Sequence, residues 1–403
     1  MKPLLPVEEA IRRVLDGVEP LAAEEVPLAA AVGRVLAEPL HALRTQPPHD
    51  VSAMDGYALR AADIASTALP ATLRVIGSAP AGHAFAGLVG PGEAVRIFTG
   101  AGVPDGADAI LLQEDAAVLP DGRIEAREAV RPGQHIRRRG LDFCAGDRVI
   151  EPGIRLGMRQ LALAAALDHA KVPVRRKPVV AIIATGDELV PPGSGDGGSG
   201  IVASNGYGIG ALVESLGGLV RDLGIVRDDR AALAAAIDAA MGADVLVTIG
   251  GASVGDHDLV RDVLQDRGMT LDFWRIAMRP GKPLLFGRLK ATRVLSLPGN
   301  PVSSLVCALL FLRPLVEALL GMPFVDPTVG ARLGSQVRAN DVRQDYIRAR
   351  LTIDDDGGRV ATPLERQDSA MLSAFHRAEC LIVRPPHADA EAKGARCRVV
   401  ILP

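Results

Sequence analysis

The sequence predicts a multidomain protein of α/β plus β class, built around a doubly wound α/β domain at residues 178–326. The runs PVVAIIAT and ADVLVTIGG are continuously apolar and β-branched, which is typical of strands buried on both faces. Helical patterns alternate with them, in SNGYGIGALVESLG, DRAALAAAIDAAM and DLVRDVLQDRG. Such alternation predicts a mostly parallel sheet with helices on both faces.

The rest of the chain divides by its texture. Residues 1–44 and 145–177 show helical periodicity, with helices expected at PVEEAIRRVLDG, LAAAVGRVLAEPL and 157–170, and we interpret them as one discontinuous helical domain. Between them, residues 45–144 carry short strand-like runs such as TLRVIGS and AVRIFTG, which predicts an inserted β-rich domain. Residues 327–403 contain YIRARLTI, RVATPL, ECLIVRP and CRVVIL, which predicts a small C-terminal β domain.

The composition argues against several classes of protein. The 403 residues are 48% hydrophobic and can bury several cores. A net charge of −3 and 3% aromatic residues give no basis for nucleic acid as a partner. The four cysteines form no CxxC pair, which favours a reduced, cytoplasmic protein without structural zinc. We expect no membrane partner, since the N-terminus lacks a signal-peptide pattern and the apolar run VSSLVCALLFL stops at Arg313.

Five segments of the α/β domain follow predicted strands, where doubly wound folds bind ligands. They are TGDEL (185–189), RDD (227–229), GGASVGDHD (250–258), MRPGKP (278–283) and LPGNPVS (297–303). Glycines let the backbone approach a phosphate closely, and Arg279 and Lys282 can hold oxyanions. Carboxylates at the same edge suit Mg²⁺ that bridges a phosphate. The pattern therefore predicts a site for a phosphorylated ligand with a metal.

Eight segments carry a more specific resemblance. They are SAMDGYA (52–58), RIFTGAGVPDGADAILLQED (96–115), GQHIRRRGLDF (133–143), ATGDEL (184–189), SNGYG (204–208), GGASVGDHD, RIAMRPGKPL (275–284) and SLPGNPVSS (296–304). In this order they resemble the molybdopterin molybdenumtransferase family, which includes MoeA and the gephyrin E domain. The similarity runs from about residue 5 to the C-terminus, and eight ordered segments are far more specific than any single one.

The resemblance implies an activity and an assembly. It implies an L-shaped homodimer of four-domain subunits, with a molybdopterin-binding-like α/β domain. It implies insertion of molybdate into the dithiolene of adenylylated molybdopterin with release of AMP, the final step of molybdenum cofactor biosynthesis, with Mg²⁺ required. In the family the active site lies between the α/β domain of one subunit and the inserted β domain of the other. A molybdopterin adenylyltransferase and molybdoenzymes are the partner proteins that it suggests.

The resemblance also assigns roles to individual residues. The implied catalytic residues are Asp55, Asp142, Glu188, Asp228 and Asp258, of which Glu188 and Asp258 are the expected metal ligands. The implied substrate-binding residues are Thr99, Arg137, Gly250, Gly251, Ser253, Arg275, Arg279, Lys282, Pro298 and Pro301. Some family members carry lysine at positions 275 and 279, where arginine keeps the charge but changes the geometry of its contacts.

Several of these residues also fit structural roles. Asp256 and Asp258 fit the N-cap of the following helix, and for Asp256 that role is at least as well supported as a ligand role. His257 fits a solvated loop, since no second His or Cys stands at ligand spacing. Asp55 fits a DG turn and Thr99 a strand end, while Asp187 and Glu188 fit a helix start. Residues 137–139 fit a solvated charge run, Pro301 fits the first position of a helix, and Pro298 fits the turn before it.

Two other functions compete with molybdate insertion. One is molybdopterin adenylylation, a sibling activity of a single α/β domain. GGASVGDHD stands where that sibling family has GGTG, and the additional domains here also argue against it. The other is a non-catalytic, cofactor-carrying scaffold, which the lack of a fused second α/β domain and of a long disordered linker disfavours.

Overall fold

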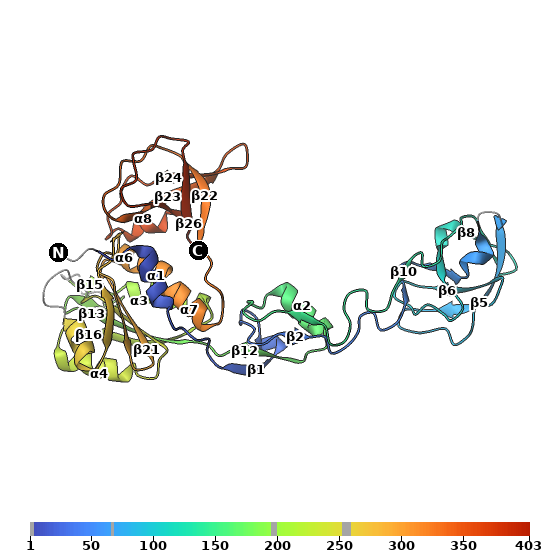
Figure 1. The fold of residues 1–403 in the computed structure, drawn as a ribbon, viewed down its shortest axis with the longest axis horizontal. Coiled ribbons are helices and arrows are strands. Elements are labelled where there is room, and N and C mark those ends of the chain that lie inside the picture. The colour runs from blue at the N-terminus through green and yellow to red at the C-terminus, as the bar shows by residue number, and fades with distance from the viewer. Residues whose placement is uncertain (1–3, 66–67, 195–199, 252–258) are drawn as a thin grey trace.

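The computed structural model describes residues 4–65, 68–194, 200–251 and 259–403, and the molecule is elongated (Figure 1). The α/β domain and the C-terminal β domain lie at one end, and the inserted β-rich unit lies at the other. A small unit that contains helix α2 lies between them. Within one chain, the inserted unit is therefore well separated from the α/β domain.

The α/β domain has the predicted doubly wound core. Its six-stranded sheet has the order β16-β13-β17-β21-β20-β18, in which the first four strands are parallel and β20 pairs antiparallel with both β21 and β18. The strands are β13 (Val179–Thr185), β16 (Leu219–Val226), β17 (Val245–Ile249), β18 (Thr270–Trp274), β20 (Leu285–Leu289) and β21 (Thr292–Leu297). The helices are α3 (Asn205–Ser215), α4 (Arg230–Ala239) and α5 (Leu259–Asp266), and a short pair, β14 (Leu189–Val190) and β15 (Ile201–Val202), lies beside them. Two apolar clusters, one on each face, bury the central strands.

A long apolar helix completes this core. It comprises α6 (Pro301–Cys307), a π-helical turn η5 (Ala308–Leu312) and α7 (Arg313–Leu319). By length and composition it could cross a membrane, but 72% of its most apolar window is buried inside the protein. Helix α1 (Val7–Leu15) packs on it through Val7, Ala10 and Val14. This placement corrects the assignment of α1 to the helical unit, because its apolar face is buried in the α/β core.

The intermediate unit is mostly strands around one helix. Its elements are β1 (Ala23–Pro27), η1 (Leu28–Ala30), β2 (Leu40–His41), β11 (Arg148–Ile150), α2 (Met158–Ala166) and β12 (Lys171–Arg175). Helix α2 lies where expected, but the helix expected over LAAAVGRVLAEPL is wrong. Gly33 has a φ of 72°, and Val35 and Leu36 form bridges to Arg155 and Val174. Pairing with distant strands outweighs the local helical pattern there.

The inserted unit contains the predicted strand runs. Its sheet has the order β7-β4-β6-β5-β9-β8. The elements are β4 (Gly56–Leu59), η2 (Ala61–Ile64), β5 (Ala71–Ala79), β6 (Glu93–Ile97), β7 (Ala109–Leu112), η4 (Gln113–Asp115), β8 (Ala116–Val118) and β9 (Ile124–Ala126). Two chain segments connect it to the intermediate unit, and β3 (Val51–Ser52) pairs with β10 (Ile136–Arg137) where they enter.

The C-terminal domain is a closed β barrel. Its strands are β22 (Thr328–Leu333), β23 (Gln344–Ile353), β24 (Arg359–Pro363), β25 (Cys380–Arg384) and β26 (Arg396–Ile401), with a short helix α8 (Leu372–His376). The ring closes because β23 pairs with both β24 and β25. Strand β19 (Met278–Arg279), which follows β18 of the α/β domain, pairs in parallel with β23. The barrel is therefore joined to the predicted ligand edge of the α/β domain.

Candidate functional site

A cavity of about 610 Å³ lies at the carboxyl ends of β13, β17 and β21. Six residues with implied roles line it: Glu188, Asp228, Gly250, Gly251, Pro298 and Pro301. They come from four of the five segments that follow predicted strands. The structure therefore brings together residues that are more than a hundred positions apart in the chain, and we call this space the glycine-turn cavity.

The turn at the end of β17 requires glycine. Gly250 and Gly251 have φ values of 92° and 67°, in the left-handed region. A Cβ at Gly250 would lie 2.4 Å from the carbonyl oxygen of Thr185, and one at Gly251 would lie 2.3 Å from Val260 Cγ2. The backbone N–H of Gly250 donates to the carbonyl of Leu297 at 3.1 Å, which ties the turn to β21. The turn thus exposes bare backbone at the wall of the cavity.

Two carboxylates face this turn from neighbouring strand ends. Asp228 accepts a hydrogen bond from the hydroxyl of Thr185, and Glu188 lines the cavity beside it. Asp187 has a structural role, since it accepts the backbone N–H of Asp228 at 3.2 Å. Asp229 caps α4 by accepting the N–H of Ala232 at 2.8 Å. Ser253, Asp256, His257 and Asp258 lie outside the described residues.

The start of α3 and the PGNP turn form the opposite wall. Asn205 Nδ2 donates to the carbonyl of Gly299 at 2.8 Å, and Asn300 Nδ2 donates to Ser369 Oγ of the C-terminal domain at 3.1 Å. Pro301 occupies the first turn of α6, as its structural interpretation expects. This wall is therefore braced from two domains.

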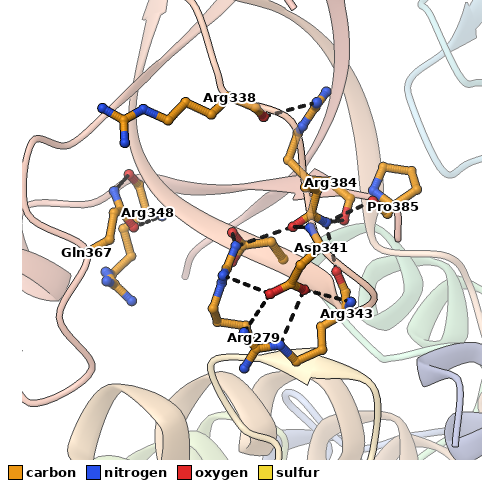
Figure 2. Close-up of polar contacts among 10 residues, drawn as sticks. Arg279, Arg338, Asp341, Arg343, Arg348, Gln367, Arg384 and Pro385 are labelled. Carbon is orange, nitrogen blue, oxygen red and sulfur yellow. Dashed lines mark hydrogen bonds and ion pairs between the residues drawn. The ribbon is translucent and has the colours of Figure 1, made fainter. Parts of the chain in front are cut away.

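A second cavity, of about 920 Å³, lies between the MRPGKP segment and the barrel. Pro283 lines both cavities, so the two are neighbours. Arg279 and Lys282 line the second one together with Ser369 and four further arginines of the C-terminal domain, and we call it the arginine cavity. Those four are Arg338, Arg343, Arg348 and Arg384 (Figure 2).

Most of these arginines already have protein partners. Arg279 forms ion pairs with Asp345 at 2.5 Å and Asp341 at 3.3 Å, and its hydrogen bond to Asp345 raises its pKa. Arg343 pairs with Asp341 at 2.6 Å and lowers the pKa of that carboxyl to about 2. Arg384 pairs with Glu391 at 2.8 Å. These ion pairs fix the charged wall of the cavity (Figure 2).

Arg348 differs from them. It is 1% exposed, and its Nε and Nη2 have no hydrogen-bond partner among the described residues. Burial lowers its pKa, because the charged form loses hydration. The Gln367 side chain fixes the backbone of Arg348: its Oε1 accepts the Arg348 N–H at 3.0 Å, and its Nε2 donates to the Arg348 carbonyl at 2.9 Å. Unpaired buried donors are costly, so this position fits an anion that arrives with the ligand.

Sequence reasoning missed Arg348 and Ser369. The pattern of the YIRARLTI strand gives no signal for Arg348, because Ile347, Ala349 and Leu351 form the face that packs in the barrel core and Arg348 lies on the opposite face. For Ser369 the sequence offers no signal either, because its position depends on the docking of the two domains.

Arg275 is placed differently from its expected role. Its guanidinium carbon lies 3.7 Å from the centre of the Trp274 ring, and its φ is 70°. It does not line either of the two cavities formed by the described residues. Stacking on an indole orients its guanidinium by cation–π attraction, and this contact accounts for its position.

The remaining expected residues lie in or next to the inserted unit. Asp55 Oδ1 accepts both the backbone N–H of Thr99, at 2.7 Å, and its hydroxyl, at 2.8 Å. These bonds lower the pKa of Asp55. Arg137 and Asp142 are exposed in the segment that leads back to the intermediate unit. Within one chain, none of these four residues lines either cavity, and the inserted unit lies at the other end of the molecule from the α/β domain (Figure 1).

The described residues contain no group of three His, Cys, Asp or Glu side chains that could hold a metal. All four cysteines are free. Burial raises the pKa of Cys307, and it raises that of Cys380 to about 12, so these two thiols stay protonated at neutral pH.

Comparison with known proteins covers nearly the whole chain. Family models match as the MoeA N-terminal region (domain I and II) at residues 5–167, a probable molybdopterin binding domain at 181–318, and the MoeA C-terminal region (domain IV) at 330–402. A molybdopterin molybdenumtransferase from Haemophilus influenzae is 36% identical over 94% of each chain. One from Nostoc is 36% identical over 82% of this chain and 78% of its own.

Solved structures agree with this. A molybdopterin biosynthesis moeA protein from Pyrococcus horikoshii OT3 has a TM-score of 0.86 at 29% identity, and covers 99% of this chain and 100% of its own. A second Pyrococcus structure has a TM-score of 0.85 at 34% identity, covering 99% of both chains. The order of domains, the glycine-turn cavity and these relatives agree, and the chain belongs to the MoeA family of molybdopterin molybdenumtransferases.

Proposed function

We propose that this chain inserts molybdate into adenylylated molybdopterin and releases AMP, the final step of molybdenum cofactor biosynthesis. One observation carries the proposal: a cavity suited to a phosphorylated ligand adjoins a cavity suited to an oxyanion, with Pro283 in the wall of both. The names of the relatives add molybdopterin and molybdenum as the chemistry.

The glycine-turn cavity is suited to the phosphorylated substrate. Residues Ser204–Gly206 at the N-terminal end of α3 line it, and a helix N-terminus presents free N–H groups to a phosphate. Gly250 and Gly251 allow a phosphate to approach the backbone closely. These groups act by binding and orienting the substrate, which is the main contribution a protein makes to phosphoryl chemistry.

The arginine cavity is suited to molybdate. A tetrahedral oxyanion accepts hydrogen bonds on every oxygen, and Arg348 offers two N–H-bearing nitrogens that have no partner in the part of the chain that the structure describes. Lys282 adds a compact positive charge, and Ser369 adds a hydroxyl. Arg279 is held by Asp341 and Asp345, so its role here is to set the local field and shape the cavity wall.

Glu188 and Asp228 fit the Mg²⁺ that the resemblance implies. Mg²⁺ prefers carboxylate oxygens, keeps several waters, and is commonly held by one or two carboxylates with substrate phosphates. When bound, it would neutralise charge that develops on the cleaved phosphate. The Thr185 hydroxyl donates a hydrogen bond to one oxygen of Asp228 and so fixes the orientation of that carboxylate.

The thiolates that capture molybdenum belong to the substrate. Cys307 and Cys380 are buried, and their raised pKa values keep them protonated. The chain's own residues therefore bind and orient the reactants. Hydrolysis of the phosphoanhydride bond, in which the oxygen of a water molecule bonds to phosphorus, would release AMP and leave the other phosphate on the pterin. The two dithiolene sulfurs would replace oxygen ligands of molybdate, and these leave as water with the thiol protons.

We further propose that a second copy of the chain completes the site. The inserted unit, which contains Asp55 and Thr99, lies at the other end of the molecule from the α/β domain, and Arg137 and Asp142 lie in the segment that leads back from it (Figure 1). In a two-fold dimer of elongated chains, antiparallel association would bring the distal unit of one copy to the α/β domain of the other. The expected cytoplasmic location and partner enzymes stay predictions.

The direct test is AMP release by purified protein given adenylylated molybdopterin, Mg²⁺ and molybdate. We expect release that depends on molybdate and falls at least about 100-fold in Glu188→Gln. The matched control is Glu214→Gln, on the exposed side of α3, which should behave as wild type. ATP consumption with release of pyrophosphate would instead favour molybdopterin adenylylation. Tight ligand binding without any turnover would favour the cofactor-carrying scaffold.

A further inference from the structure

Asp50 holds the segment that carries Arg137. Its Oδ2 accepts from Arg138 Nη1 at 2.5 Å, and its Oδ1 accepts the backbone N–H of Arg139 at 2.8 Å. The Asp50 side chain is 34% exposed and that of Arg138 is 62% exposed. The Asp50 carboxylate thus binds both the side chain of Arg138 and the backbone of Arg139, and we call this arrangement the clamp.

This clamp lies next to a fixed strand pair. Arg137 is opposite Val51, and Ile136 is opposite Ser52, in the β3–β10 pair. Asp50 directly precedes β3, and Arg138 directly follows β10. Successive side chains along an extended segment point to opposite sides. With Arg138 bound to Asp50, the Arg137 side chain is directed away from the clamp.

The contacts of this clamp also distinguish Arg137 from the two arginines that follow it. Arg138 is paired with Asp50, and Arg139 Nε donates to the carbonyl of Pro48 at 3.1 Å. Arg137 is exposed and makes no side-chain hydrogen bond or ion pair with another described residue. The backbone N–H of Arg139 and the guanidinium of Arg138 lower the pKa of Asp50, so its carboxylate is charged at neutral pH.

We propose that Asp50 is a positioning residue for the reaction and acts through Arg137. It holds the connector so that the Arg137 guanidinium faces the phosphate of the adenylylated substrate in the other copy's glycine-turn cavity. This inference rests on the proposed function, and it adds a residue with no implied role in the resemblance.

The experiment is a double-mutant cycle on AMP release. Asp50→Ala should raise KM for the adenylylated substrate about tenfold while kcat changes less than about twofold, because binding geometry is lost and the chemical groups remain. Asp50→Asn keeps an acceptor for the Arg139 N–H and should give an intermediate KM. In an Arg137→Ala background, Asp50→Ala should raise KM no further, since interacting residues are non-additive.

The matched control is Asp121→Ala. Asp121 accepts from Arg123 Nε at 2.7 Å and from its backbone N–H at 3.1 Å, so it makes the same kinds of contact elsewhere in the inserted unit. We expect its KM to equal that of wild type. A purely structural clamp at Asp50 would affect thermal unfolding without the selective change in KM.

Unchanged KM in Asp50→Ala, or effects that multiply in the double variant, would overturn the proposal. If Asp50→Ala does not fold, Arg138→Gln removes the ion pair of the same clamp, keeps the bond from the Arg139 N–H, and must raise KM in the same direction. If wild type releases no AMP, the proposed function fails. Affinity for the adenylylated ligand, measured by calorimetry, then tests Asp50 by itself through the same cycle of variants.

Discussion

Replacing Arg348 with methionine should stabilise the barrel and abolish the response to molybdate. Arg348 is 1% exposed and leaves Nε and Nη2 without acceptors among the described residues. Each unsatisfied buried polar group costs about 1–3 kcal/mol, so the two together cost about 2–6 kcal/mol. Methionine retains much of the apolar stem, and replacing buried charge by apolar groups commonly gains about 1–4 kcal/mol.

The assay is thermal unfolding with and without molybdate. In a barrel of this size, each kcal/mol shifts Tm by about 4–8 °C, so Arg348→Met should unfold several degrees above wild type in the absence of the oxyanion. At 100 times Kd, molybdate should stabilise wild type by about 2.7 kcal/mol and leave the variant unchanged. The difference in Tm between the two proteins should therefore shrink or reverse when molybdate is added.

Arg384→Met provides the contrast. Arg384 is 3% exposed, pairs with Glu391 and donates to the carbonyl of Asp389, so its loss leaves acceptors unpaired. We expect that variant to be destabilised by about 1–3 kcal/mol. The reasoning is refuted if Arg348→Met is destabilised to the same extent, or if it still responds to molybdate.

Three further predictions concern other parts of the molecule. Gly250→Ala should destabilise the protein more than Gly242→Ala does, as measured by urea unfolding. Both glycines have a left-handed φ, which costs about 1–2 kcal/mol for alanine. Only at Gly250 would the added Cβ also meet a backbone oxygen, at 2.4 Å. Mixing Asp55→Ala with Glu188→Ala subunits should restore about a quarter of wild-type AMP release, since half of the randomly formed dimers then contain one intact site; no recovery would place both residues in one chain's site. Arg343 lowers the pKa of Asp341 from 3.8 to about 2, so the stabilisation by this carboxylate is complete above pH 3.8 and is lost as pH falls through about 2. The difference in unfolding free energy between wild type and Asp341→Asn should therefore shrink over that interval, and a constant difference would contradict the assignment.

The parts predicted well from sequence are those whose local pattern matches their burial. Strands β13 and β17 are buried along nearly their whole length, and their continuous apolar runs reflect this directly. The segment after η1 was predicted wrongly because helical spacing does not register that Gly33 takes a left-handed φ or that Val35 and Leu36 pair with distant residues. Local periodicity is informative only where no long-range pairing competes with it.

The site could be predicted in part for the same reason. Glu188, Asp228 and Gly250 follow strands of one parallel sheet, so the fold class alone places them at one edge. Arg348 and Ser369 could not be inferred, because their position depends on how the barrel docks. The implied substrate-binding role of Arg275 stays a prediction, and the structure shows its guanidinium stacked on the neighbouring Trp274 ring.

The docking of the barrel determines whether the arginine cavity exists at all. In the β19–β23 pair, Arg279 is opposite Asp345, and the same two residues form the 2.5 Å ion pair. Arg348 lies three residues further along β23, so the register that fixes Arg279 also fixes Arg348 at the cavity. Asn300 contacts Ser369 across the same junction, between the wall of the glycine-turn cavity and that of the arginine cavity. Any change that separates the barrel from the α/β domain should therefore remove the response to molybdate while leaving the glycine turn intact.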